Sequence, residues 1–406
     1  MKEKQNQLIE AYNRSIDEFK KLFKEVFISL YGKSNKEIIV SCGPARINII
    51  GEHIDNYGGN VFPAAIDKYL FCAIRKRNDA TIYYDDLRFP GRLTFSLADK
   101  LSYKKENSYG NYLNGMVQIL RDEGYTIDTG FEVLLFSLIP EGGGISSSAA
   151  LEMGFGSALV ALFNLPVDNV KLALLGKKSE NEFMNVKCGI MDQFASSMGK
   201  ANCAIDLNCA TLEYTYVPID LKDYCFVVMN SNKVRTLAGS EYNSRREDCE
   251  KALDLLQKNG FAVKNLCEID SCQLETVRKV LTDDVLYRRA LHCITENARE
   301  KEALTVLNNG DLTALGELLK QSHASLRDNY EVSCLELDTL VDFANNYPTC
   351  LGSRLIGAGF GGCCLALVAK NSVQDFIQKN GEQYREKIGY DALFFECLCA
   401  EGARVL

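Results

Sequence analysis

A glycine- and serine-rich stretch at residues 139–152 carries the side chains and backbone best suited to binding phosphate. It reads Ile-Pro-Glu-Gly-Gly-Gly-Ile-Ser-Ser-Ser-Ala-Ala-Leu-Glu. The three glycines lack a Cβ, so their backbone can approach a ligand closely. Good helix formers follow, with Leu151, Phe155 and Leu159 at helical spacing. A helix that begins at such a loop directs unpaired N–H groups and its positive dipole end at one point, which favours phosphate. The alternative is a glycine turn closed by a serine N-cap.

This stretch differs from the two commonest phosphate loops. The P-loop of many nucleotide hydrolases needs a glycine, four residues and then Gly-Lys-Ser/Thr. The one Gly-Lys-Ser here, at residues 32–34, has Phe27 in place of the first glycine. The dinucleotide-binding fingerprint is also excluded, because the three glycines are consecutive and no acidic residue follows at the required distance. We therefore expect a third kind of phosphate loop.

A second polar stretch, Gly51-Glu52-His53-Ile54-Asp55-Asn56-Tyr57-Gly58-Gly59, follows an apolar segment that contains Arg46. Two carboxylates, a histidine and an amide are costly to bury unless they have partners. Their mixture of donors and acceptors suits a polyhydroxylated ligand such as a sugar. The alternative is an exposed turn, since Asn, Asp and Gly are common in turns.

Asp192 lies among apolar residues in the stretch Gly189-Ile190-Met191-Asp192-Gln193-Phe194, which we expect to begin a helix. A carboxylate in a first helical turn often stabilises the helix dipole. An acid between apolar neighbours can equally act as a base in a cleft. The sequence pattern leaves both readings open.

Composition excludes several classes of partner. The 406 residues are 47% hydrophobic and 25% charged, enough for a large core and two domains. A net charge of −8 argues against nucleic acid or an anionic membrane as the main partner. We find neither a signal peptide nor an apolar run long enough to span a membrane. Sixteen scattered cysteines without paired Cys-x-x-Cys spacing suggest reduced thiols in the cytoplasm rather than disulfides or zinc.

The elements expected to position these residues follow from periodicity. One amphipathic helix is predicted from Leu8 to Val26, and a strand, a turn at Gly43-Pro44 and a second strand over 38–50. Further strands are predicted at 70–75, 81–84, 92–96, 131–138, 203–207, 212–217, 224–229, 363–368 and 392–398. Helices are predicted at 109–121, 172–183, 241–258, 335–345 and 373–388. We place a boundary between two domains, 1–217 and 218–406.

Three separated blocks together resemble the motifs of the GHMP small-molecule kinases: residues 43–55, residues 140–152 and the glycine stretch 357–363. The first block, with Val61-Phe62-Pro63-Ala64-Ala65-Ile66, is similar to the sugar-binding motif of the galactokinase branch. The resemblance spans most of the chain. It implies an α+β, two-domain GHMP kinase fold, with an N-terminal ribosomal protein S5 domain 2-like domain and a C-terminal ferredoxin-like domain. The active site then lies in the cleft between them.

The resemblance also implies a reaction, the transfer of the ATP γ-phosphate to the anomeric hydroxyl of galactose. Asp192 matches the position that accepts or polarises the sugar proton. Arg46 is then expected to hold Asp192 ionised and to neutralise charge on the phosphoryl group. Five further positions match those that contact the sugar: Glu52, His53, Asp55, Gly189 and Tyr242.

For the nucleotide, the resemblance implies that residues of the phosphate loop wrap the triphosphate: Gly142, Gly143, Gly144, Ile145, Ser146, Ser147 and Ser148. Ser148 and Glu180 are the candidate Mg²⁺ ligands, since Mg²⁺ takes a few protein oxygens together with water and phosphate. The implied partners are therefore a small-molecule sugar, ATP and Mg²⁺. We expect a monomer or weak dimer that binds neither nucleic acid nor membrane.

Four departures from the galactokinase pattern lie within these motifs, and two of them are next to Asp55. Ala45 and Ala358 stand in place of glycine, Ile54 in place of threonine, and Asn56-Tyr57 reverses the usual order. Another sugar 1-kinase therefore stays open, acting on N-acetylgalactosamine, a uronic acid or arabinose. A non-catalytic sugar sensor is a further alternative, although the serine-alanine part of the phosphate loop is intact.

Overall fold

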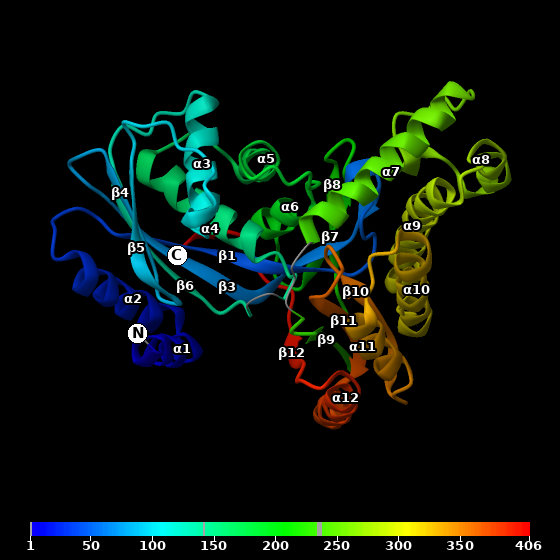
Figure 1. Cartoon of the computed structure of the whole chain (residues 1–406). Helices are drawn as coiled ribbons and strands as arrows, with labels where there is room; N and C mark the ends of the chain where they lie inside the picture. Colours follow the sequence, from blue (N-terminus) through cyan, green and yellow to red (C-terminus); the bar gives the residue numbers. More distant parts are fainter. Residues whose placement is uncertain (1, 141–142, 234–237) are drawn as a thin grey trace.

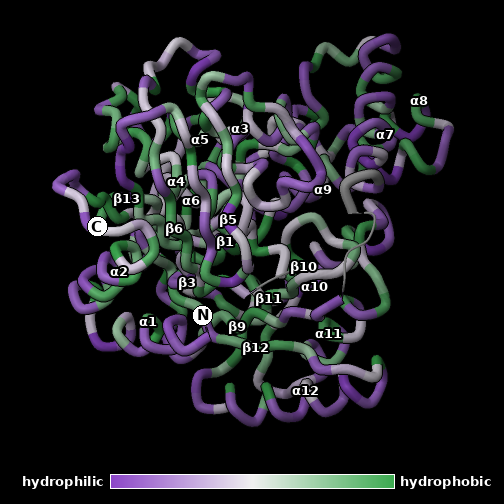
Figure 2. The backbone as a smooth tube through the Cα atoms, turned by 60° about the vertical axis from the view of Figure 1, so that its left-hand side comes forward, coloured by the Kyte–Doolittle hydropathy of each residue, from purple (hydrophilic) through white to green (hydrophobic). Residues whose placement is uncertain are grey.

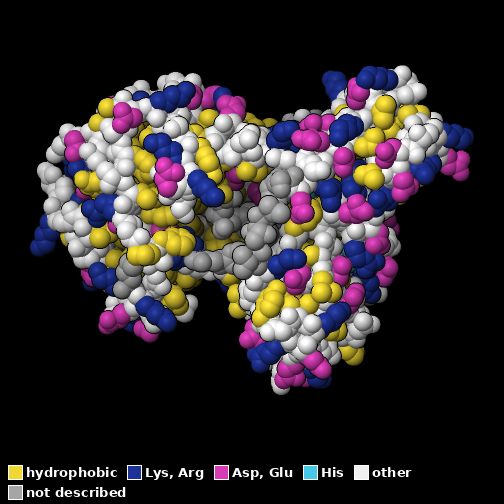
Figure 3. Space-filling view, in the orientation of Figure 1, with side chains coloured by type: hydrophobic (Ala, Val, Ile, Leu, Met, Phe, Trp, Pro, Cys, Tyr) yellow, Lys and Arg dark blue, Asp and Glu magenta, His cyan; other side chains and the backbone are white. Residues whose placement is uncertain are grey.

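The structure, a computed structural model, describes residues 2–140, 143–233 and 238–406, and only the backbone of residues 238–240. Within these residues the strands form three sheets, and helices cover both faces of the largest of them (Figure 1). The space-filling view shows two lobes with a hollow between them (Figure 3). None of the described helices combines the length and hydropathy needed to cross a membrane.

The first lobe is built on a six-stranded sheet of order β13-β1-β3-β6-β4-β5. Its neighbouring strands are antiparallel except for β4 and β6, which are parallel. The strands are β1 (Ile39–Asn48), β3 (Pro63–Lys76), β4 (Thr81–Asp86), β5 (Phe89–Ser96), β6 (Phe131–Ser137) and β13 (Arg404–Val405). Strand β3 is much longer than the predicted segment 70–75. Its first half pairs with the end of β1 and follows the polar loop at residues 51–59 after the short strand β2 (Asn60–Val61).

Two helices, α1 (Lys2–Arg14) and α2 (Ile16–Tyr31), cover one face of this sheet (Figure 1). Aromatic side chains fill the contact, with the rings of Phe19 and Phe71 4.2 Å apart. The prediction of one helix over 8–26 was wrong, because Ser15 separates the two helices. Its backbone is extended, and its hydroxyl accepts a hydrogen bond from the N–H of Glu18, so it caps α2.

The other face carries the helices that lead to the phosphate loop and to Asp192. They are α3 (Gly110–Asp122), α4 (Ser147–Phe163), α5 (Asn169–Lys178) and α6 (Met191–Met198). A π-helical turn over Ser179–Phe183 continues α5. Helix α4 packs directly on β1 and β3. The sheet and this helix therefore fix the position of the loop that precedes α4.

The predicted turn at Gly43-Pro44 is absent from the described structure, where β1 is one continuous strand with a register irregularity between Pro44 and Arg46. Gly43 marks a close approach instead. A Cβ at Gly43 would lie 2.1 Å from the carbonyl oxygen of Ala150 and 2.6 Å from the nitrogen of Gly154, both in α4. Only glycine lets the strand and the helix backbone come this close.

The second lobe is built on an antiparallel sheet of order β10-β11-β9-β12. Its strands are β9 (Tyr224–Asn230), β10 (Cys350–Ile356), β11 (Cys363–Ala369) and β12 (Leu393–Cys397). The helices of this half are α7 (Ala238–Lys258), α8 (Leu274–Val280), α9 (Asp284–Asn308), α10 (Leu312–Ser325), α11 (Leu335–Asn345) and α12 (Val373–Ile388). Strands β9 to β11 are mostly hydrophobic, whereas the outer helix α12 is mostly hydrophilic (Figure 2).

Two features join the halves of the chain. A small third sheet, of β2 (Asn60–Val61), β7 (Cys203–Asn208) and β8 (Tyr214–Pro218), borders α9 through β2. The chain also returns at its end to the first lobe, where β13 pairs with β1 and Ser41 lies opposite Val405. The division of the chain between residues 217 and 218 stays a prediction.

Candidate active site

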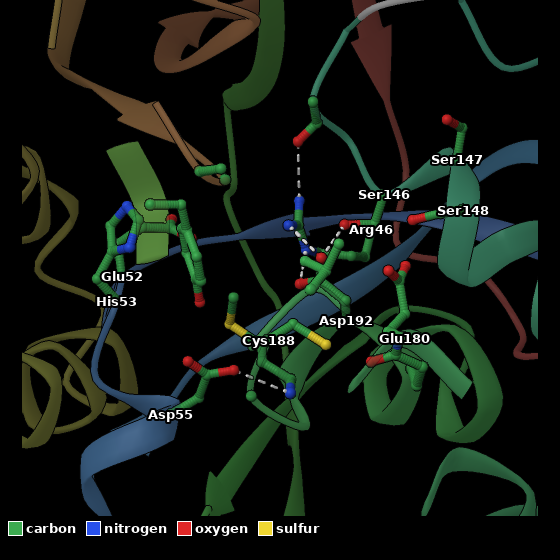
Figure 4. A pocket seen from close by; sticks show the side chains of 18 of the residues that line it. Arg46, Glu52, His53, Asp55, Ser146, Ser147, Ser148, Glu180, Cys188 and Asp192 are labelled. Atoms are coloured by element: carbon green, nitrogen blue, oxygen red, sulfur yellow. Dashed lines mark hydrogen bonds and ion pairs between the residues drawn. The ribbon is translucent and has the colours of Figure 1, made fainter. Parts of the chain in front are cut away.

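A cavity of about 390 Å³ lies between the two lobes. Segments from both halves of the chain line it, and Figure 4 shows their side chains pointing into the same space. Twelve of the predicted site residues are among its lining residues: Arg46, Glu52, His53, Asp55, Gly144, Ser146, Ser147, Ser148, Glu180, Gly189, Asp192 and Tyr242. The fold therefore brings the phosphate loop, the polar loop and Asp192 together.

An ion pair between Arg46 and Asp192 lies at the centre of the cavity (Figure 4). Arg46 Nε donates to Asp192 Oδ1 at 2.8 Å, and Nη2 donates to Oδ2 at 2.9 Å. This two-point contact fixes the plane of the carboxylate. The Arg46 side chain is 3% exposed, whereas that of Asp192 is 32% exposed toward the cavity. The arrangement holds one carboxylate oriented and accessible to a ligand.

The same arginine ties the ion pair to the phosphate loop. Its Nη1 donates to the carbonyl oxygen of Gly144 at 3.3 Å, and its backbone N–H donates to that of Ile145 at 3.2 Å. The hydroxyl of Ser146 donates to Asp192 Oδ2. Ser146 occupies the N-cap position of α4 with a φ of 58°, but its hydroxyl is directed at Asp192. The serine N-cap reading of this stretch therefore does not describe Ser146.

The remaining residues of the predicted phosphate loop divide into three groups. Ser147 and Ser148 begin α4 and line the cavity, so the positive end of the helix dipole faces it. Ile145 is buried, and a Cβ at Gly143 would contact Asn230 and Cys363 at 3.4 Å; neither Ile145 nor Gly143 lines the cavity. Gly142 lies outside the described residues.

Glu180 approaches the start of α4 from the π-helical turn that continues α5. Burial raises the pKa of Glu180 to about 7, while a hydrogen bond from Ser148 opposes this rise. Carboxylate and hydroxyl oxygens suit Mg²⁺, and a bound cation would favour the ionised carboxylate. Within the described residues no group of three or more His, Cys, Asp or Glu side chains could hold a metal by itself. A cation here therefore needs further ligands from water or phosphate.

Glu52, His53 and Asp55 of the polar loop line the end of the cavity that lies away from the phosphate loop (Figure 4). His53 has a φ of 63°, in the left-handed region that non-glycine residues rarely adopt. Burial lowers the pKa of His53 to about 3, so its ring is neutral at physiological pH. Its Nε2 is buried and has no hydrogen-bond partner among the described residues. His53 also lines the cavity, so a ligand hydroxyl that approached this nitrogen would have no protein partner to displace.

Asp55 is held beside the stretch that carries Asp192. Its Oδ2 accepts a hydrogen bond from the N–H of Met191 at 3.3 Å. Burial raises the pKa of Asp55, and the nearby carboxylate of Asp192 adds to this effect. A Cβ at Gly189 would lie 1.9 Å from Asp55 Oδ2, so only glycine leaves room for this carboxylate. The ring of Tyr242 lies 5.6 Å from that of His53, and its hydroxyl accepts from Asn56 Nδ2 at 3.1 Å.

Two residues beside Asp55 that depart from the family pattern, Ile54 and Tyr57, lie behind the residues that line the cavity. Ile54 is fully buried and packs against Gly59, and Tyr57 is buried with its hydroxyl 3.5 Å from that of Tyr330. Neither belongs to the described lining residues, whereas Ala358 does. Ile54 and Tyr57 thus act on the ligand only through the loop conformation.

Sequence reasoning missed five side chains of the cavity wall: Tyr112, Val186, Cys188, Met191 and Gln193. Cys188, Met191 and Gln193 are neighbours of Gly189 and Asp192, and this proximity was a usable signal. Tyr112 belongs to the apolar pattern of α3, which is also what a core residue of that helix would show. The third glycine motif contributes Gly357, whose Cβ position lies 2.4 Å from the carbonyl oxygen of Gly144.

Comparison with protein families agrees with this arrangement. The models of the GHMP kinase N-terminal and C-terminal domains match residues 111–200 and 302–386, and the galactose-binding signature of galactokinases matches residues 25–76. The galactokinase of Clostridium perfringens (strain SM101 / Type A) is 44% identical over 381 residues, covering 93% of this chain and 97% of that protein. The galactokinase of Staphylococcus carnosus (strain TM300) is 45% identical over 370 residues, covering 91% and 95%.

Solved structures show the same fold. The crystal structure of Lactococcus lactis galactokinase complexed with galactose superposes with a TM-score of 0.92 at 41% identity, covering 95% of this chain and 99% of that one. A mevalonate kinase structure superposes with a TM-score of 0.62 at 20% identity, covering 89% and 98%. The second likeness concerns the fold alone.

Proposed function

The chain belongs to the galactokinases of the GHMP kinase family, and on this premise we propose that it transfers the γ-phosphate of ATP to the anomeric hydroxyl of galactose. The products are galactose 1-phosphate and ADP. The observation that carries this proposal is the oriented Arg46–Asp192 pair between a glycine-serine loop and a loop of sugar-binding type.

Asp192 accepts or polarises the proton of the anomeric hydroxyl, and Arg46 holds the carboxylate in place. Because phosphoryl transfer passes through a loose transition state, positioning and charge contribute more than early proton removal. The guanidinium of Arg46 also contacts the phosphate loop, so it is placed to neutralise charge on the transferring group. The Ser146 hydroxyl helps to orient Asp192.

The sugar occupies the end of the cavity formed by Glu52, His53, Asp55, Gly189 and Tyr242. His53 Nε2 and the Asp55 carboxylate pair with sugar hydroxyls, and the Tyr242 ring covers a face of the sugar. His53 is buried and the Asp55 carboxylate is partly buried, so a sugar that lacks the matching hydroxyl would leave one of these polar groups unpaired at a substantial cost in binding free energy.

The triphosphate of ATP lies against the loop from Gly142 to Ser148 and the start of α4. Ser148 and Glu180 are the residues that fit Mg²⁺, since they offer a hydroxyl and a carboxylate oxygen at the phosphate end of the cavity. Bound Mg²⁺ would neutralise phosphate charge. We also propose a cytoplasmic enzyme that acts as a monomer or weak dimer. None of the sixteen cysteines, all of which lie in the described part of the chain, forms a disulfide, which suits a reducing compartment.

The test is ADP release by the purified protein with Mg-ATP and galactose, N-acetylgalactosamine, galacturonate, arabinose or glucose. We expect a clear preference for galactose, and a preference for another sugar would identify a different sugar 1-kinase. Asp192→Ala should lose at least about a thousandfold in kcat while its galactose Kd, measured by calorimetry, changes less than about threefold. Substantial turnover by this variant would contradict the role of Asp192, and no turnover by the wild type with any sugar would contradict the kinase function.

A further inference from the structure

The loop that faces the sugar is held in place by side chains from the second half of the chain. Glu296, in α9, is fully buried. Its Oε1 accepts hydrogen bonds from the backbone N–H of Gly51 at 3.1 Å and of Glu52 at 3.4 Å. One carboxylate oxygen therefore fixes two consecutive peptide groups directly before His53.

Arg354, in β10 of the four-stranded sheet, contacts both Glu52 and Glu296. It is fully buried, and its Nη2 pairs with Glu52 Oε2. Its Nη1 lies 3.4 Å from Glu296 Oε1 and donates to Ser322 Oγ at 3.1 Å. Ser322 in turn donates to Glu296 Oε1 at 2.6 Å. Arg354 thus joins the side chain of Glu52 to the carboxylate that holds its backbone.

A third contact holds the next peptide group, the one that joins Glu52 to His53. Nε2 of His292 lies 3.0 Å from the carbonyl oxygen of Glu52, and its Nδ1 lies 3.0 Å from Ser325 Oγ. The ring of Tyr330 lies between the two histidines, 4.8 Å from His53 and 4.7 Å from His292. The backbone N–H, the carbonyl and the side chain of Glu52 are all held by residues more than two hundred positions further along the chain.

This restraint bears on His53 because its backbone is strained. A non-glycine residue in the left-handed region persists only where its surroundings determine it. In this conformation His53 lines the cavity, and its Nε2 has no hydrogen-bond partner among the described residues. Neither Glu296 nor Arg354 belongs to the described lining of the cavity, so both act through the loop.

We propose that Glu296 and Arg354 are positioning residues for sugar recognition, which hold Gly51–His53 in the conformation that aims His53 at the sugar. This inference rests on the proposed function. It predicts that weakening the Glu296–Arg354 contact impairs sugar binding and leaves phosphoryl transfer from ATP largely intact, because Asp192 and the phosphate loop are held by other contacts.

The test is steady-state kinetics of Glu296→Gln and Ser322→Ala with galactose and ATP varied separately. Glu296→Gln should raise the galactose KM at least about tenfold, and Ser322→Ala at least about threefold, with kcat and the ATP KM within about 1.5-fold of the wild type. A role confined to stability would instead lower the active fraction, and hence kcat, without changing the galactose KM.

The matched control is Glu132→Gln, which removes another buried carboxylate paired with an arginine. Glu132 Oε2 lies 2.7 Å from Arg75 Nη2 in the first sheet. This variant should lose stability but keep the wild-type galactose KM. If Glu296→Gln fails to fold, Ser322→Ala decides the question alone.

An active wild type together with an unchanged galactose KM in the folded variants would overturn this inference and leave the proposed function intact. A wild type that is inactive with every sugar would overturn both. The two failures are therefore distinguished by the wild-type assay.

Discussion

Buried carboxylates in this molecule fall into two kinds, those with a cationic partner and those without one. Glu132 is paired with Arg75, and Glu52 and Glu296 with Arg354. Glu300, in α9, is fully buried, and both its carboxylate oxygens have no hydrogen-bond partner among the described residues. An isolated buried carboxylate is stable only in its neutral form. Glu300 is therefore a site where proton binding and folding are linked.

We predict that Glu300→Gln stabilises the protein increasingly as the pH rises. Burial raises the pKa of Glu300 to about 8, and the nearby Asp206 adds to the rise. The folded state therefore holds a proton that the unfolded state releases above about pH 4.3. The stability that this proton confers is complete below that pH, and it is lost as the pH rises toward 8, by about 1.4 kcal/mol per unit. Glutamine has the same shape and cannot ionise.

Urea unfolding of both proteins between pH 6 and pH 9 measures this effect. The free energy of unfolding of Glu300→Gln minus that of the wild type should grow from pH 6 to pH 8 and level off above it. The control is Glu302→Gln, at an exposed position of the same helix, for which the difference should stay flat. A difference for Glu300→Gln that is equal at every pH would contradict the assigned protonation.

At the scale of elements, the packing of α4 on β1 decides where the phosphate loop lies. Gly43 and Gly154 face each other across this contact, and a Cβ at Gly154 would lie 2.8 Å from the nitrogen of Gly43. The obstructing atoms belong to the backbone, so no side-chain rotation can relieve the clash. The start of α4 would have to move away from the sheet.

We predict that Gly43→Ala lowers the free energy of unfolding by at least about 1–3 kcal/mol, the usual cost of overpacking. It should also raise the ATP KM, because the displaced helix carries Ser147 and Ser148. The matched control is Gly381→Ala in α12, where the nearest described atom, in Phe394, lies at an ordinary 3.6 Å. That change should be stabilising by about 0.5–1 kcal/mol. Urea unfolding and ATP titrations check both, and a neutral Gly43→Ala would contradict the account of this contact.

Local patterns in the sequence predicted most elements near the site, including α3, β6, α6 and β9. The predictions failed where the same local sequence pattern is compatible with two different structures. Gly43-Pro44 has the composition of a turn, but here the glycine permits a close approach within a continuous strand. Ser15 lies inside an amphipathic pattern that continues across it, so the break between α1 and α2 is hidden.

The predicted site residues were recognisable because they lie in short contiguous motifs. Arg354 and Glu296 were not, because their relation to Glu52 exists only after folding. Arg354 and Glu52 are 302 positions apart, and no periodicity connects them. The pairing of β13 with β1 was hidden for the same reason. What the sequence could not supply is the set of contacts between its two halves.

At the scale of the whole molecule, the cavity belongs to both lobes. Asp55 and the stretch 188–192 come from the first half of the chain, whereas Tyr242, Gly357 and Ala358 come from the second. A sugar bound there would contact both lobes, so moving either lobe away from it would cost binding free energy. By mass action, galactose at 100 times its Kd lowers the equilibrium constant of every opening that releases it by about 100-fold.

Hydrogen exchange with and without galactose, in the absence of ATP, tests this coupling. We expect galactose to slow amide exchange in residues 51–55 and 188–192 and, equally, in residues 291–297 and 354–358. The reason is that the contacts of Glu296, His292 and Arg354 cannot open without moving the polar loop. Helices α1 and α2 serve as the internal control, since they cover the sheet face that lies away from the cavity. Slower exchange confined to residues 51–55 and 188–192 would contradict this coupling, because it would mean that galactose does not stabilise the contacts made by the second half of the chain.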